Sequence, residues 1–75
     1  MLAGMAVRTL DLEVMHRGRR EDTFQVSGDA GDAGWLSGQL RGWLELKRWS
    51  EPRWGEFELI AREAGTWKQL AKVRA

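Results

Sequence analysis

Five tryptophans lie close together in this sequence: Trp35, Trp43, Trp49, Trp54 and Trp67. An indole ring combines a large apolar area with one N–H donor. Tryptophan therefore fills small cores, anchors protein interfaces and stacks on nucleic-acid bases. A short chain either buries all five rings or leaves some of them for a partner, and the function class depends on which of the two holds.

Residues that could catalyse a reaction are scarce. The chain has no cysteine, and His16 is its only histidine. His16 precedes the arginine-rich segment Arg17–Arg20 with no nucleophile beside it, so we interpret it as a solvated turn residue rather than a general base. We expect no catalytic residue and no enzymatic activity.

The motifs that hold metals or phosphates are also missing. Asp29 and Asp32 are too few for a calcium loop and better suit the N-cap of a helix. Gly28, Gly31 and Gly34 are not followed by the Lys-Ser/Thr pair of a phosphate-binding loop. One histidine without cysteines cannot make a structural zinc site. We therefore expect no metal and no cofactor.

The charges are nearly balanced, with 12 Lys and Arg against 11 Asp and Glu. This balance argues against strong electrostatic capture of nucleic acid. No apolar run approaches the ~20 residues of a membrane span, so we expect a cytoplasmic protein that does not enter a membrane. Free use of Gly, Ala, Arg and Trp is typical of a GC-rich genome, such as that of an actinobacterium or its phage.

A chain of 75 residues makes one domain, residues 1–75, with residues 1–5 expected to form a tail. Domains of this size have marginal stability and often gain it from disulfides, metals or a partner subunit. Because cysteine is absent, efficient packing or self-association is the remaining source of stability, and tryptophan serves both.

The first part of the chain predicts a β-hairpin. Residues 7–15 alternate between apolar and polar, as do residues 23–26, and Gly18 supplies the turn between them. A break over residues 27–34 follows. Residues 30–41 then predict a short helix that ends at Gly42 and contributes Trp35 to the protein core. The four-residue spacing of Gly34, Gly38 and Gly42 suggests close packing of this helix on the sheet.

Strand period competes with helix period over residues 35–49, because leucine or glycine occupies every even position from Leu36 to Leu46. We divide the segment into a helix and a strand over residues 43–49. Residues 50–53 predict a turn at Pro52, residues 56–62 a strand, residues 63–66 a hairpin loop and residues 67–73 the last strand.

The predicted fold is α+β, with the order ββαβββ, a mostly antiparallel sheet and one helix on one face. The alternative is an all-β five-stranded meander or small barrel. The predicted core consists of Leu10, Leu12, Val14, Phe24, Val26, Leu36, Leu40, Leu44, Leu46, Phe57, Leu59 and Ala61.

In this arrangement some tryptophans face away from the helix. Trp43 and Trp49 leave the sheet on its outer face, and Trp54 pairs with Trp49 across the Pro52 turn. An apolar patch with a basic rim is typical of an interaction surface. The predicted patch consists of Trp43, Trp49, Trp54, Ile60, Arg48, Arg53 and Arg62.

The sequence therefore predicts a non-enzymatic protein–protein interaction or assembly module, with self-association through the tryptophan-bearing face as its simplest form. The alternative is a single-stranded nucleic-acid-binding domain in which tryptophans stack on bases and Lys and Arg follow the phosphates. Glu45, Glu56 and Glu58, on or near the same face, weigh against nucleic acid.

Overall fold

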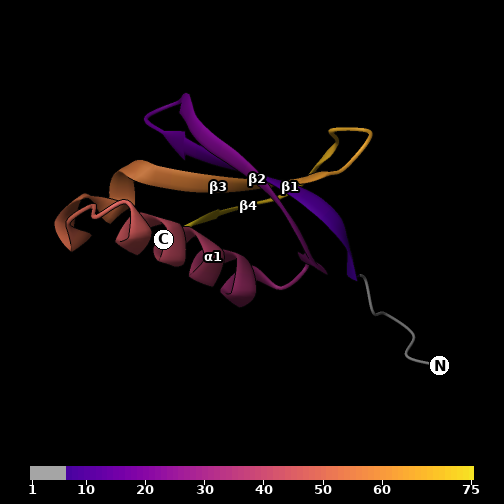
Figure 1. The fold of residues 1–75 in the computed structure, drawn as a ribbon, viewed down its shortest axis with the longest axis horizontal. Helices are drawn as coiled ribbons and strands as arrows, with labels where there is room; N and C mark the ends of the chain where they lie inside the picture. The colour runs from indigo at the N-terminus through magenta and orange to yellow at the C-terminus, as the bar shows by residue number, and fades with distance from the viewer. Residues whose placement is uncertain (1–6) are drawn as a thin grey trace.

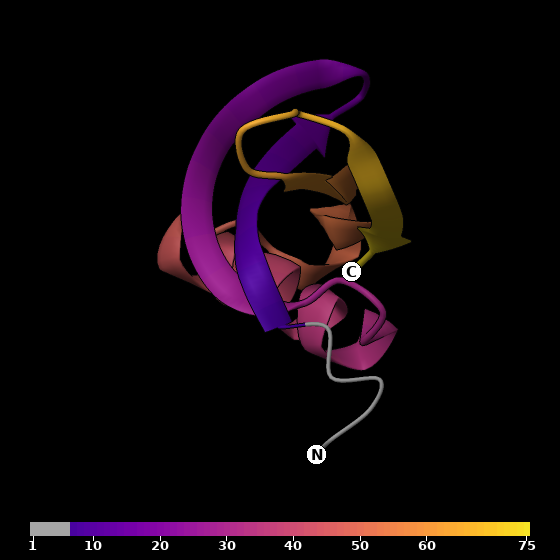
Figure 2. The same ribbon diagram turned by 90° about the vertical axis from the view of Figure 1, so that its right-hand side faces the viewer.

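A four-stranded antiparallel sheet carries one helix on one face in the computed structural model, which describes residues 7–75 (Figure 1). The predicted tail, residues 1–5, lies outside the described residues. The elements are β1 (Val7–His16), β2 (Arg19–Asp29), α1 (Ala33–Leu46), the 3-10 helix η1 (Glu51–Glu56), β3 (Phe57–Glu63) and β4 (Gln69–Arg74). The strand order β2-β1-β3-β4 confirms the α+β class, and the sheet curls strongly along its length (Figure 2).

The first hairpin forms as predicted. Arg17 and Gly18 both have positive φ, 52° and 82°, as a type I′ turn between two strands requires. Val14 pairs with Asp22 but Met15 pairs with Arg20, so Glu21 is the extra residue of a β-bulge. β2 continues through the predicted break as far as Asp29 and becomes the longest strand.

The core lies between the helix and one face of the sheet. The alternating residues Leu10, Leu12 and Val14 are fully buried there. They are joined by Leu36, Leu40, Trp43 and Leu44 from α1 and by Phe57, Leu59 and Ala61 from β3. Two predicted core residues, Phe24 and Val26, are half-buried at the sheet edge. Leu46 is 75% exposed, so its assignment to the core was wrong.

The predicted strand over residues 43–49 does not exist, because α1 continues to Leu46. Its buried positions 36, 40, 43 and 44 follow helical spacing, which places adjacent Trp43 and Leu44 on one stripe. Asp32 is the N-cap, and its side chain accepts a hydrogen bond from the Trp35 amide at 3.0 Å. The predicted helix end at Gly42 was wrong; α1 ends at Leu46 with Lys47 as its C-cap, and the next residue, Arg48, has a φ of +62°.

The last third of the chain completes the sheet without a three-strand meander. Pro52 is the second residue of η1, which forms in place of the predicted simple turn. β3 then pairs with β1 on one side and with β4 on the other, so β2 and β4 form the two edges. Trp67 lies in the β3–β4 connection with φ +64°, and not in a strand. Within residues 7–75, neither helix has the length and apolarity to cross a membrane.

Candidate interaction surface

The seven residues of the predicted patch do not share one face. Trp43 and Ile60 are each only 9% exposed. Trp43 faces the core from α1. Ile60 lies opposite Glu13 on the other face of the sheet, because its neighbours Leu59 and Ala61 point into the core. The strand that was expected to turn Trp43 outward is a helix, and the helix turns it inward.

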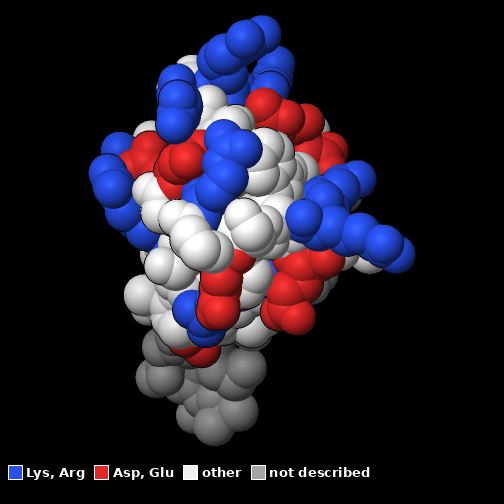
Figure 3. All heavy atoms as spheres, turned by 90° about the vertical axis from the view of Figure 1, so that its left-hand side faces the viewer, with Lys and Arg blue, Asp and Glu red and all other residues white. Residues whose placement is uncertain are grey.

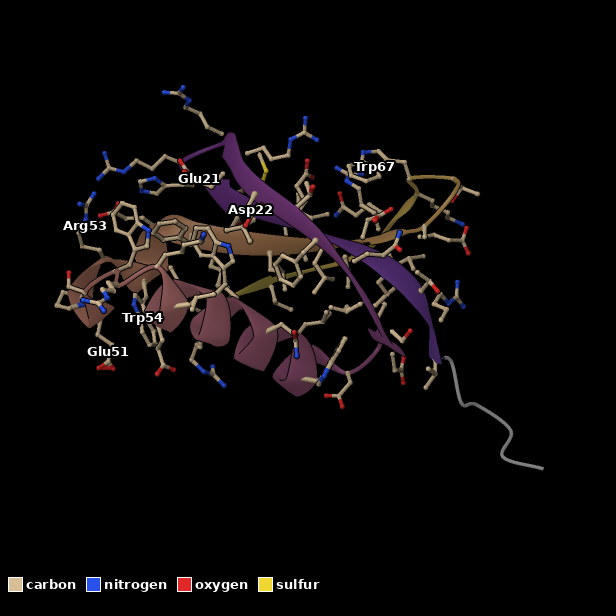
Figure 4. The ribbon with its side chains drawn as sticks, in the orientation of Figure 1. Glu21, Asp22, Glu51, Arg53, Trp54 and Trp67 are labelled. Atoms are coloured by element: carbon tan, nitrogen blue, oxygen red, sulfur yellow. The ribbon has the colours of Figure 1, made fainter. Side chains whose placement is uncertain are left out.

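Arg62 belongs to the face of the sheet away from α1. Its Nε donates a hydrogen bond to the Glu13 carboxylate at 3.1 Å, and its guanidinium lies 5.2 Å from the centre of the Trp67 ring. Arg20 contacts the other Glu13 oxygen at 3.4 Å, so a buried carboxylate is held between two arginines. In Figure 4, Trp67 lies far along the molecule from Trp54. Arg62 and Ile60 are therefore not neighbours of the Trp49–Trp54 pair.

Trp49, Trp54 and Arg53 do come together, at the end of the molecule where η1 lies. The Trp54 indole N–H donates a hydrogen bond to the Trp49 carbonyl at 2.9 Å. The Arg53 guanidinium lies 4.8 Å from the centre of the Trp49 ring. Trp49 also contacts the Phe57 ring edge at a centroid distance of 4.9 Å. Both indole rings are half-buried, and both already contact residues of their own chain.

The charges at this end are paired within the chain. Glu56 accepts hydrogen bonds from Arg53, at 3.0 and 3.2 Å, and its Oε1 lies 2.8 Å from His16 Nε2. Hydrogen bonds from Arg53 and His16, together with the charges of Arg17 and Arg53, lower the Glu56 pKa to about 2. The His16 ring stacks on Phe57 at 4.2 Å, so its interpretation as a solvated turn residue was wrong.

A groove between α1 and β2 is the feature that the sequence interpretation missed. It has a volume of about 410 Å³. It is lined by Asp22, Phe24, Gly38, Gln39, Gly42, Trp43, Leu46 and Lys47. The exposed side chain of Leu46 forms one apolar wall and half-buried Phe24 the other. Apolar surface with a few polar groups is the usual lining of a binding site.

The floor of the groove is held by a fixed polar contact. The Trp43 indole N–H donates a hydrogen bond to the Asp22 carboxylate at 2.9 Å, and this bond connects the middle of α1 to β2. A hydrogen bond from a buried donor to a charged acceptor is stronger than one between neutral groups. This hydrogen bond holds the Trp43 ring in one orientation at the groove.

Glycines give the helix side of the groove its open shape. A Cβ atom built on Gly38 or Gly42 would meet no atom within 4 Å. The prediction that these glycines allow the helix to pack closely on the sheet was therefore wrong. Close packing needs glycine at Gly28 instead, where a Cβ atom would overlap the Trp35 ring. Gly38 and Gly42 leave bare helix backbone beside β2.

β2 adds a row of backbone groups to this surface. It is an edge strand of 11 residues, and β1 is its only strand partner in the described chain. Long edge strands readily pair with another chain unless they are interrupted or covered. The bulge at Glu21 interrupts β2 near the hairpin turn, which leaves residues 22–29 as a regular edge.

Lys, Arg, Asp and Glu are interspersed over the end of the molecule that carries η1 and the first hairpin turn (Figure 3). No continuous basic field covers this end.

Comparisons with models of known protein families, with curated proteins and with solved structures find no match. Two mid-helix glycines beside an exposed leucine were the sequence signal that could have revealed the groove.

Proposed function

We propose that this chain is a small non-enzymatic protein-interaction module, and that it binds its partner through the edge of β2 and the adjoining groove. The observation that carries this proposal is the apolar groove beside the outer edge of β2, which pairs with no other strand in the described part of the chain. Addition of a strand to a sheet edge, with side chains seated in a neighbouring groove, is a recurrent mode of protein recognition. A cytoplasmic location fits this role.

The aromatic end of the molecule supports the same class of function in a secondary way. Trp49, Trp54 and Arg53 have the composition of an interface anchor, but each already contacts a neighbour in its own chain. They extend the surface beyond Trp43, whose ring approaches Phe57 at 5.9 Å. The groove is therefore the centre of the proposed surface and the aromatic end its margin.

A single-stranded nucleic acid is the alternative partner, and the geometry favours it less. A stacking platform for bases required Trp43, Trp49 and Trp54 on one face of the sheet. Trp43 instead lies on α1 and is buried in the core. Arg53 lies over the ring of Trp49 and pairs with the Glu56 carboxylate. The Trp49 ring would have to separate from Arg53 to stack on a base, and Arg53 would have to leave Glu56 to bind a phosphate.

The test compares two neighbouring helix positions. Gly42→Gln places a side chain in the groove, whereas Arg41→Gln places the same residue on the exposed helix surface outside it. Affinity capture from native cells, followed by binding measurements with the recovered protein, should show binding lost in Gly42→Gln and kept in Arg41→Gln. Equal binding by both variants would contradict the assignment of the groove. Titration with labelled single strands that quenches tryptophan fluorescence would favour the alternative.

A further inference from the structure

We infer that the partner at this surface is a second copy of the chain, whose β2 pairs antiparallel with the first β2 across a two-fold axis. This inference rests on the proposed function. The two sheets then become one continuous sheet of eight strands, and two β2 edges that have no strand partner among residues 7–75 cover each other. The sequence of β2, its charges and the groove beside it support this pairing.

The residues of β2 are self-complementary about Gln25. A two-fold axis perpendicular to the sheet leaves every side chain on the same side of the joined sheet. Each residue of β2 therefore lies opposite a residue of the second copy whose side chain is on that same side. With the axis at Gln25, Phe24 lies opposite Val26 of the second copy. Thr23 lies opposite Ser27 in the same way. Apolar residues thus meet on the helix face and hydroxyl residues on the other face.

Charge supports the antiparallel direction at the two ends of β2. The strand begins Arg19-Arg20-Glu21-Asp22, where the charges are balanced, and it ends at Asp29. In-register parallel pairing would place Asp29 beside Asp29 of the second copy and Arg20 beside Arg20, whereas antiparallel pairing separates these like charges. The bulge at Glu21 moves Arg20 to the register position that faces Asp29 of the second copy.

Two of these charges have no ion pair within the described chain. Among residues 7–75, no carboxylate lies within ion-pair distance of Arg19, and no cation lies within that distance of Asp29. Asp29 instead accepts a backbone hydrogen bond from Gly31 at 2.8 Å. The second copy would bring Asp29 a partner of opposite charge in Arg20, whose guanidinium also contacts Glu13 of its own chain.

The groove explains where the apolar side chains of the second copy go. Phe24 lines the groove, and Val26 is half-buried on the same face of β2. Phe24 and Val26 of the second copy would lie against this face and extend the apolar surface of Leu46. Bare helix backbone at Gly38 and Gly42 leaves room for them, because a Cβ atom at either position would meet nothing within 4 Å.

The absence of cysteine from the sequence makes the register directly testable. Gln25→Cys places a thiol on the axis, opposite its own copy, at a separation that suits a disulfide. We expect this variant to oxidise to a covalent dimer. Thr23→Cys or Ser27→Cys alone should cross-link poorly, while a mixture of the two should give the mixed dimer. Gln69→Cys on the opposite edge strand, β4, is the matched control and should stay monomeric.

Sedimentation velocity of the unmodified protein completes the test. A concentration-dependent dimer that Gly42→Gln weakens and Arg41→Gln preserves is the expected result. A strict monomer would overturn this inference. If capture of a different protein still depended on Gly42, the proposed function would stand without it. A dimer that cross-links through Gln69→Cys and not through Gln25→Cys would also overturn the inference, since it would place the interface at β4.

Discussion

Alanine at Gly38 and Gly42 should make the folded monomer more stable. A helical glycine is about 1 kcal/mol less favourable than alanine, and a Cβ atom at either position would meet nothing within 4 Å. Each substitution should therefore raise the free energy of unfolding by about 0.5–1 kcal/mol, partly by restricting the unfolded chain. The double variant should gain about 1–2 kcal/mol.

Urea unfolding followed by tryptophan fluorescence measures these changes, because most of the indoles are wholly or partly buried. For a domain of this size, each kcal/mol corresponds to about 4–8 °C in Tm. The midpoint should rise while the m-value stays constant, since the surface exposed on unfolding hardly changes. Gly28→Ala is the internal control. It should destabilise the fold by about 1–3 kcal/mol, because its methyl group would overlap Trp35.

A loss of stability in Gly38→Ala and Gly42→Ala, like the loss expected for Gly28→Ala, would contradict this prediction. That result would mean that the helix backbone at these positions is covered within the monomer, so that the groove is not open. A gain in monomer stability together with weaker dimerisation would instead separate the two roles of the helix.

Five other substitutions test two indole hydrogen bonds, the Glu56 ion pairs and the end of α1. Trp43→Phe should lower the free energy of unfolding by about 2 kcal/mol, because the hydrogen bond to a charged carboxylate is lost, and Trp54→Phe, which loses a bond to a neutral carbonyl, should cost only about 1 kcal/mol. Equal losses in urea unfolding would contradict this assignment. Glu56→Gln should be less stable than the parent at neutral pH, and the difference should disappear as the pH falls from about 4.5 to about 2, because the lowered pKa stabilises the fold only while the carboxylate is ionised. Thermal unfolding across that pH range measures the effect, and a constant difference would argue against the Glu56 ion pairs. Arg48→Gly should raise Tm by relieving a positive φ, with a gain of about 1 kcal/mol, whereas Lys47→Gly, at φ −85°, should lower it.

The strands were predictable because their apolar residues alternate without ambiguity. Residues two positions apart share a face in a strand but not in a helix. This spacing holds for Leu10, Leu12 and Val14 in β1 and for Phe57, Leu59 and Ala61 in β3, and all six are fully buried. The α+β class followed from these strands together with the helix that begins after Asp32.

The segment around Trp43 carried two periods, and local pattern could not choose between them. Leucines and glycines at even positions imitate a strand, yet Trp43 is buried beside Leu44, which only the helix permits. Treating Trp43 as outward-facing assembled the wrong patch. Treating Gly42 as the helix end removed it from consideration as part of a surface. The pairing of β1 with β3 is a long-range contact that no local pattern contains.

That central pairing also determines when the protein can fold. The first hairpin is local, but its apolar face is completed by β3, where His16 lies opposite Phe57 and Leu10 opposite Glu63. Contacts between residues so distant in sequence slow folding, because a long loop must close before they form. During synthesis β3 must leave the ribosome before the middle of the sheet can close. Until then the buried leucines of β1 and α1 lack the core residues that β3 supplies.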